Sequence, residues 1–300
     1  MRARAAGLTL IAAAVLAGAA CSNAPLSKQD PAPGLHAAAP EPSPAVRVTL
    51  PKSPLSEDQQ ITHALNRLGY GPRPGDVERV RQMGLARWIE RQLEPGRIPD
   101  ERVEAALQAF PTLTMPVPEL VRAYPQPDQK VLAKIRSGQL SQEEMRAMAP
   151  PEKRPFRIPV ELQAAKLTRA VLSGRQLEEV MTDFWFNHFN VDARKGAVKW
   201  MVADYERTAI RPHALGKFRD LLLATARHPA MLFYLDNWMS TKADLVPVFG
   251  PNRGRKMGLN ENYAREIMEL HTLGVDGGYT QEDVIEVARA FTGWSIERPR

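Results

Sequence analysis

The chain contains 300 residues and carries a formal net charge of +6, from 40 Lys and Arg against 34 Asp and Glu. Because its basic residues are spread among acidic ones, the excess charge is typical of a solvated surface, and we expect no nucleic-acid partner. Cys21 is the only cysteine, which excludes disulfides and thiolate metal sites from the folded part.

The first 21 residues have the pattern of an export signal. Arg2 and Arg4 precede an apolar run from Ala5 to Ala20, which is shorter than the about 20 residues that a membrane-spanning helix needs. Cys21 follows this run, where bacterial lipoproteins carry their acylated cysteine. We therefore expect residues 1–21 to direct export to the cell envelope and Cys21 to carry a lipid anchor, as in an outer-membrane lipoprotein or a periplasmic protein. Ordinary signal-peptidase cleavage just before Cys21 is the alternative.

Residues 22–55 form a segment rich in Pro, Ala and Ser, with few apolar side chains to bury. Such a composition does not offset the entropy that is lost on ordering, so the sequence predicts an extended linker. Ser56 and Gln59 then form a capping box in front of the first helix.

Almost every later segment shows helical spacing of its apolar residues. The proline-rich stretch of residues 111–159 predicts a loop-rich insertion, in which Ser141 and Glu144 mark one short helix. The sequence contains no alternating β-branched run long enough for a sheet. It therefore predicts an all-α, multi-helix bundle-like globular domain over residues 56–300. The expected helices cover residues 57–68, 75–83, 85–93, 101–110, 160–172, 176–189, 197–210, 212–227, 231–235 and 260–273, and one more begins at Thr280.

Four strings spread over this domain resemble one family. They are HALNRLGYGPRPGDVERV (His63–Val80), EEVMTDFWFNHFNV (Glu178–Val191), LGKFRDLLLATARHPAMLFYLDN (Leu215–Asn237) and the block Gly258–Trp294. In order and content they resemble the bacterial domain of unknown function numbered 1800. The resemblance implies a mainly helical, envelope-associated protein of no established activity, often encoded beside proteins that look like secreted phosphatases and sulfatases. It also implies a domain that continues beyond Trp294, so we expect the sequence to be truncated.

The densest group of chemically active side chains lies between residues 260 and 273. Its candidate site residues are Asn262, Arg265, Glu266, Glu269 and His271. Asn262, Glu266 and Glu269 share one helical face, whereas His271 is only two residues from Glu269 and therefore points elsewhere. Three interpretations remain open: a buried polar hub that pins neighbouring helices, a metal or acid/base site, or a surface face with ion pairs.

A second candidate segment, Asp183–Asn190, carries Asn187 and His188. His188 falls on the same apolar side as Trp185 and Phe189, which is typical of a histidine in the core. The alternative is that His188 and His271 converge, because an imidazole can titrate or bind metal near neutral pH.

Neither segment identifies a reaction, a cofactor or a metal. The favoured hypothesis is a non-catalytic envelope protein, tethered through Cys21, that binds or assists a secreted hydrolase-like partner. The alternative is a metal-dependent or acid/base hydrolase that uses Glu266, Glu269, His188 and His271.

Overall fold

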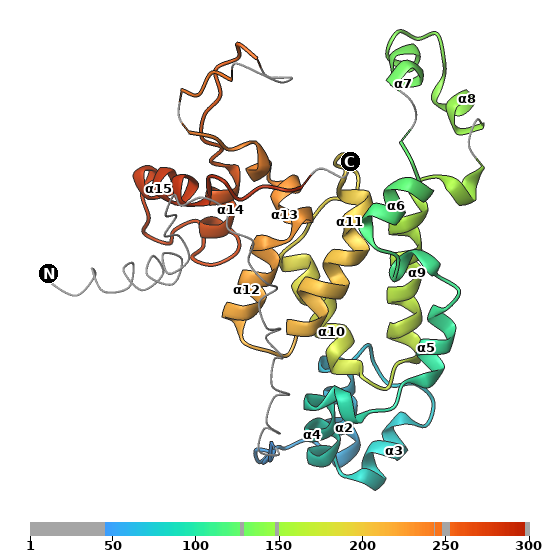
Figure 1. The fold of residues 1–300 in the computed structure, drawn as a ribbon. Coiled ribbons are helices and arrows are strands. Elements are labelled where there is room, and N and C mark those ends of the chain that lie inside the picture. Colours follow the sequence, from blue (N-terminus) through green and yellow to red (C-terminus); the bar gives the residue numbers. More distant parts are fainter. Residues whose placement is uncertain (1–45, 127–128, 148–149, 243, 248–252, 298–300) are drawn as a thin grey trace, which may run out of the picture. The chain divides into compact units, whose positions relative to one another are not determined.

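The computed structural model describes residues 46–126, 129–147, 150–242, 244–247 and 253–297 (Figure 1). The expected export signal, the Cys21 anchor and the linker up to residue 45 lie outside the described residues. Within the described ranges the secondary structure is helical, and the one β pairing is an isolated bridge between Leu245 and Met257. The prediction of an all-α fold is confirmed.

None of the described helices is long and apolar enough to cross a membrane.

Three helices pack together at the start of the domain. They are α2 (Glu57–Arg67), α3 (Asp76–Met83) and α4 (Leu85–Leu93). The predicted capping box at Ser56 is present and starts α2. Ile61 and Leu65 of α2 pack with Val80 of α3 and Trp88 of α4, and these side chains are buried. The apolar periodicity of the sequence therefore determines this core.

The proline-rich insertion is more helical than the sequence predicts. Besides α8 (Gln142–Ala147), which begins at the expected Ser141–Glu144 pair, it contains α6 (Val117–Ala123) and α7 (Gln129–Arg136). Leu120 of α6 is fully buried, and Trp200 donates a 2.8 Å hydrogen bond to the carbonyl oxygen of Tyr124. The expectation of a single short helix here was wrong, because proline is compatible with the first turn of a helix and so can begin one as well as end one.

The central part of the fold is built from a longer series of helices. They are α5 (Glu101–Leu107), α9 (Arg157–Leu172), α10 (Gln176–His188), α11 (Val198–Tyr205), α12 (Phe218–Arg227) and α13 (Pro229–Tyr234). Short 3-10 turns lie between or beside the helices: η1 (Pro95–Arg97), η2 (Pro111–Leu113), η3 (Pro151–Lys153), η5 (Arg211–His213) and η6 (Asn237–Met239). The α11 helix continues into a π-helical turn, η4 (Glu206–Ile210). The predicted helix over residues 212–227 was therefore too long, since the chain turns before Phe218.

The main core lies where α9, α11, α13 and the π-turn pack against one another. Ile158, Tyr205, Ile210 and Met231 are fully buried there. The Tyr205 hydroxyl donates a 2.8 Å hydrogen bond to the carbonyl oxygen of Phe189, so the polar end of this buried ring is satisfied. This contact also fixes the end of α10 against α11.

The last described helices form a pair. They are α14 (Asn262–Glu269) and α15 (Gln281–Phe291), and Thr280 and Asp283 form the expected capping box of α15. Ala264, Met268, Val284 and Ala288 are the buried residues between them. The predicted helix over residues 260–273 was too long, because α14 ends at Glu269, and Leu270 just beyond it is 57% exposed.

Candidate functional site

The structure brings His188 and His271 together from the ends of two helices that are distant in sequence. His188 is the last residue of α10, and His271 follows α14 by two residues. Their ring centroids are 6.2 Å apart, and His188 Nε2 donates a 3.1 Å hydrogen bond to the carbonyl oxygen of His271. The carbonyl can only accept, so this contact holds the proton of the neutral His188 ring on Nε2.

His271 is buried, and its environment favours the neutral ring. Burial lowers its pKa to about 4, and the nearby His188 adds to this effect. No acidic side chain contributes to the shift, so no carboxylate supports an imidazolium at this position. His271 is therefore neutral at physiological pH.

Aromatic rings surround the two histidines. The centroid of Phe189 lies 4.6 Å from His188 and 5.1 Å from His271, with both pairs in edge-to-face geometry. Trp185 lies 5.6 Å from His188, and its indole N–H donates to the carbonyl oxygen of Ala214 at 3.0 Å. These contacts are packing contacts of an aromatic cluster that joins α10 to the segment after α14.

Glu266 and Glu269 lie on α14 and are half-buried. Burial raises the pKa of Glu266, and the neighbouring Glu269 carboxylate raises it further. Neither side chain forms a hydrogen bond or ion pair with another described residue. Among those residues, no three His, Cys, Asp or Glu side chains are grouped so that they could hold a metal ion.

Asn187, Asn262 and Arg265 are exposed. Arg265 donates to Gln281 at 2.8 Å and forms an ion pair with Glu261 at 3.5 Å, which joins the starts of α14 and α15. Asp183 of the same helix as Asn187 forms an ion pair with Lys166 of α9, at 2.7 Å. The structure thus collects the predicted residues in one region without placing their side chains around a common point.

A buried ion-pair network lies elsewhere, at residues that no sequence motif marks. Arg211 of η5 forms a bidentate pair with Glu179 of α10, at 2.8 and 2.9 Å, and donates to Glu206 of the π-turn at 3.2 Å. The side chain of Arg211 is 20% exposed, while those of Glu179 and Glu206 are 7% and 3% exposed. Burial disfavours the charged form of Arg211, but the two carboxylates more than offset this and raise its pKa.

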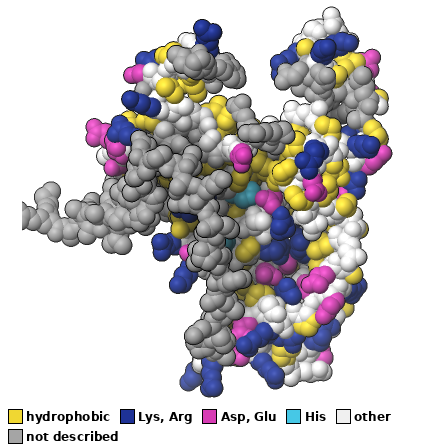
Figure 2. Space-filling view, viewed as in Figure 1, with side chains coloured by type: hydrophobic (Ala, Val, Ile, Leu, Met, Phe, Trp, Pro, Cys, Tyr) yellow, Lys and Arg dark blue, Asp and Glu magenta, His cyan; other side chains and the backbone are white. Residues whose placement is uncertain are grey.

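Two cations of α9 complete this network. Lys166 Nζ and Arg169 Nη1 lie 3.8 and 3.6 Å from the carboxylate of Glu206. Figure 2 shows acidic and basic side chains gathered over the middle of the visible face, where α9 and α10 lie. The residues of this network are far apart in sequence, and each alone resembles an ordinary surface charge. Only the helix packing brings them together.

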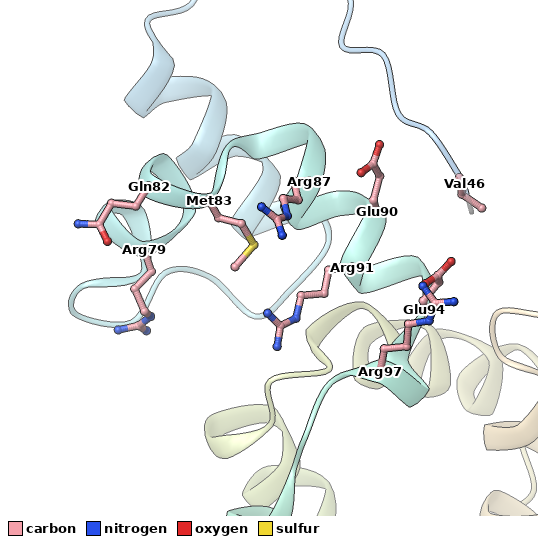
Figure 3. Close-up of a pocket in the computed structure, with 9 residues that line it drawn as sticks. All are labelled: Val46, Arg79, Gln82, Met83, Arg87, Glu90, Arg91, Glu94 and Arg97. Atoms are coloured by element: carbon pink, nitrogen blue, oxygen red, sulfur yellow. The ribbon is translucent and has the colours of Figure 1, made fainter. Parts of the chain in front are cut away.

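An arginine-lined pocket of about 660 Å³ lies on α3 and α4 (Figure 3). Arg87 and Arg91 project from α4 on the same side of Met83, and Glu90 points away from Arg91, towards Val46. Glu90 accepts a 2.8 Å hydrogen bond from the backbone N–H of Val48, so its carboxylate attaches the segment before α2 to α4. The side chains of Arg87 and Arg91 are exposed, as expected for solvated charges.

The fold and these clusters define an all-α protein in which buried ion pairs join several of the central helices. The family model described as "Protein of unknown function (DUF1800)" matches residues 63–300, and the chain belongs to this family. Neither a curated protein nor a solved structure matches the chain significantly.

Proposed function

We propose that the chain is an exported, lipid-anchored helical protein of the cell envelope that acts by binding a partner protein. The observation that carries this proposal is an exposed apolar stripe along α9. Phe156, Val160, Leu167 and Val171 are 54%, 48%, 69% and 61% exposed. Their spacing of four, seven and four residues places them on one side of the helix. The exposed polar side chain of Gln163 and the half-buried Ala164 lie between Val160 and Leu167 on this side. Four large exposed apolar side chains on one helix face are typical of a protein interaction site.

The charges of α9 indicate which kind of partner fits. Arg157 is paired with Glu161 within the helix. Lys166 forms an ion pair with Asp183, and Arg169 forms one with Glu206. The stripe therefore carries no uncompensated charge, and Ala164 lies between its larger side chains. An apolar helix of another protein matches such a face, whereas a nucleic acid or an anionic lipid surface requires free cations. A secreted hydrolase-like protein is the partner class that the family resemblance implies.

The histidine cluster has a structural role that fits a binding protein. His188 donates to a backbone carbonyl, and His271 is buried against Phe189. Both imidazoles thus pack in the aromatic cluster and join two helices.

Photo-crosslinking tests the α9 face. A benzophenone amino acid in place of Leu167 is expected to give one discrete adduct with a second envelope protein. The adduct should disappear when Val171→Glu is added and persist when Leu273→Glu, at a remote exposed apolar position, is added instead. If the adduct forms only with a second copy of the chain, the α9 face is a homodimer interface and does not bind a different protein. Equal labelling from a probe in place of the exposed Val275 would show that the α9 face is not a specific site.

An acid/base or metal-dependent hydrolase is the second candidate. Glu266 and Glu269 are half-buried, and neither pairs with another side chain of the described residues. Burial raises the pKa of Glu266, and repulsion from the Glu269 carboxylate raises it further. Metal analysis of protein purified without a histidine tag separates the two functions. Stoichiometric metal that is lost in Glu266→Ala would favour the hydrolase. A metal-free and fully folded protein would remove its metal-dependent form.

A further inference from the structure

The arginine-lined pocket on α3 and α4 has an excess of positive charge. Its charged lining residues are four arginines and two glutamates: Arg79, Arg87, Arg91, Arg97, Glu90 and Glu94 (Figure 3). The arginines come from α3, α4 and η1, which pack against one another, so the fold gathers these charges in one place. A concave surface with an excess of one charge concentrates ligands of the opposite charge.

Two of the four arginines are free to bind an anion. Arg79 and Arg97 each form an ion pair with a carboxylate three residues away. Arg87 and Arg91, by contrast, form no hydrogen bond or ion pair with any described residue, and both are exposed. They are four residues apart, which places them on one side of α4. A pair of guanidinium groups in this arrangement matches phosphate oxygens.

The N-terminal segment of the chain enters the domain at the same pocket. Val46, the first described residue, lines the pocket, and the backbone N–H of Val48 donates a 2.8 Å hydrogen bond to Glu90 of α4. The chain before Val46 leads back to Cys21, which carries the lipid in the proposed function. Free cations therefore lie where the lipid-bearing segment joins the domain. Basic residues combined with a lipid chain are typical of proteins that contact anionic headgroups.

We propose that this pocket binds the phosphate groups of an anionic membrane surface and so determines which face of the anchored domain lies against the bilayer. Arg87 and Arg91 bind the headgroup phosphates, and Met83 and Val46 supply apolar surface beside them. This inference rests on the lipid anchor of the proposed function. One arginine near such a surface strengthens binding roughly fivefold. Two arginines thus orient the domain, but they do not hold it at the membrane without its lipid.

Vesicle co-sedimentation tests the pocket with the full chain carrying Cys21→Ser, so that no attached lipid contributes. Arg87→Gln together with Arg91→Gln is expected to weaken binding to vesicles of equal parts phosphatidylglycerol and phosphatidylcholine roughly 20–30-fold. The same pair should have no effect with pure phosphatidylcholine. Circular dichroism verifies that the variant is folded.

The matched control removes the same charge elsewhere. Arg253→Gln together with Arg255→Gln, in an exposed loop, should change binding less than about twofold, because charges farther than a Debye length from the surface are screened. All variants keep the same N-terminal segment, so a difference between the two pairs reports the pocket alone. Equal weakening by both pairs, or an equal loss with pure phosphatidylcholine, would overturn the proposal.

A fluorescent probe locates the contact. Cys21 is the only cysteine, so Gln82→Cys in the Cys21→Ser chain gives a single labelling site in the pocket. A polarity-sensitive dye there should shift to the blue with the anionic vesicles, whereas the same dye in Asn262→Cys, exposed at the start of α14, should not. A shift from Asn262→Cys alone, or an equal shift at Gln82→Cys with inorganic phosphate and no vesicles, would overturn the membrane contact. Neither result bears on the lipid anchor, which palmitate labelling of Cys21 tests separately.

Discussion

Arg211 is the residue whose removal should cost the most stability. It holds Glu179 through two hydrogen bonds and Glu206 through a third, and both carboxylates are almost fully buried. Arg211→Ala leaves Glu179 without an ion-pair partner, while Glu206 keeps only the more distant Lys166 and Arg169. Removing one partner of a buried pair costs about 3–5 kcal/mol. We expect about 3 kcal/mol here, the lower end, because two cations remain.

Urea denaturation of the full chain measures this loss. The same loss can be followed in a thermal melt, because in a domain of this size about 3 kcal/mol corresponds to a fall of roughly 6–12 °C in the melting temperature. Arg289→Ala removes an exposed arginine from its pair with Glu286 and should cost less than about 1 kcal/mol. Adding Glu179→Gln to Arg211→Ala should restore part of the stability, because it removes the uncompensated charge. The reasoning is refuted if Arg211→Ala and Arg289→Ala lose similar amounts.

Three further predictions concern other parts of the chain. Because the pKa of His271 is about 4 in the folded state, below its ordinary 6.5, the unfolded state binds more protons between these values. The free energy of unfolding should thus fall by roughly 3 kcal/mol as the pH drops from about 6.5 to 4, and His271→Gln should flatten the profile measured by urea titration. Tyr205→Phe leaves the carbonyl of Phe189 without its donor, and calorimetry should record a loss of about 1–3 kcal/mol. Cys21→Ser should abolish labelling with radioactive palmitate and release the protein from the membrane fraction; labelling that persists would disprove Cys21 as the lipidated residue.

Local rules of sequence reading predicted much of the helical structure. The capping boxes at Ser56 and Thr280 both mark real helix starts, since each satisfies backbone donors of the first turn within a few residues. The rules were wrong where a local signal has two meanings. Proline at the start of α6 was interpreted as a helix breaker, although proline is also common in the first turn of a helix. The apolar periodicity after residue 212 predicted a continuous helix, although the chain turns before Phe218.

The ion-pair network could not be predicted because its members are defined by tertiary packing. Glu179, Glu206 and Arg211 lie on three different elements, and a charged residue in a single sequence is by default exposed. The π-turn matters here, because its insertion into the helix after Tyr205 changes the direction of the side chains that follow. By contrast, His188 and His271 were recognisable as candidates, since His188 ends one helix that had to be packed and His271 follows another.

Helix α9 faces two environments, which give its side chains different physical requirements. Lys166 and Arg169 face the buried carboxylate of Glu206, where a cation must match a fixed charge within the domain. Leu167 and Val171 are exposed on the stripe, where a partner gains by removing apolar surface from water. A charge in place of Leu167 therefore acts on docking without touching the ion pairs, and a neutral residue in place of Arg169 acts on the ion pairs without changing the stripe. A Leu167 variant that lost as much stability as Arg211→Ala would indicate that α9 itself had been displaced.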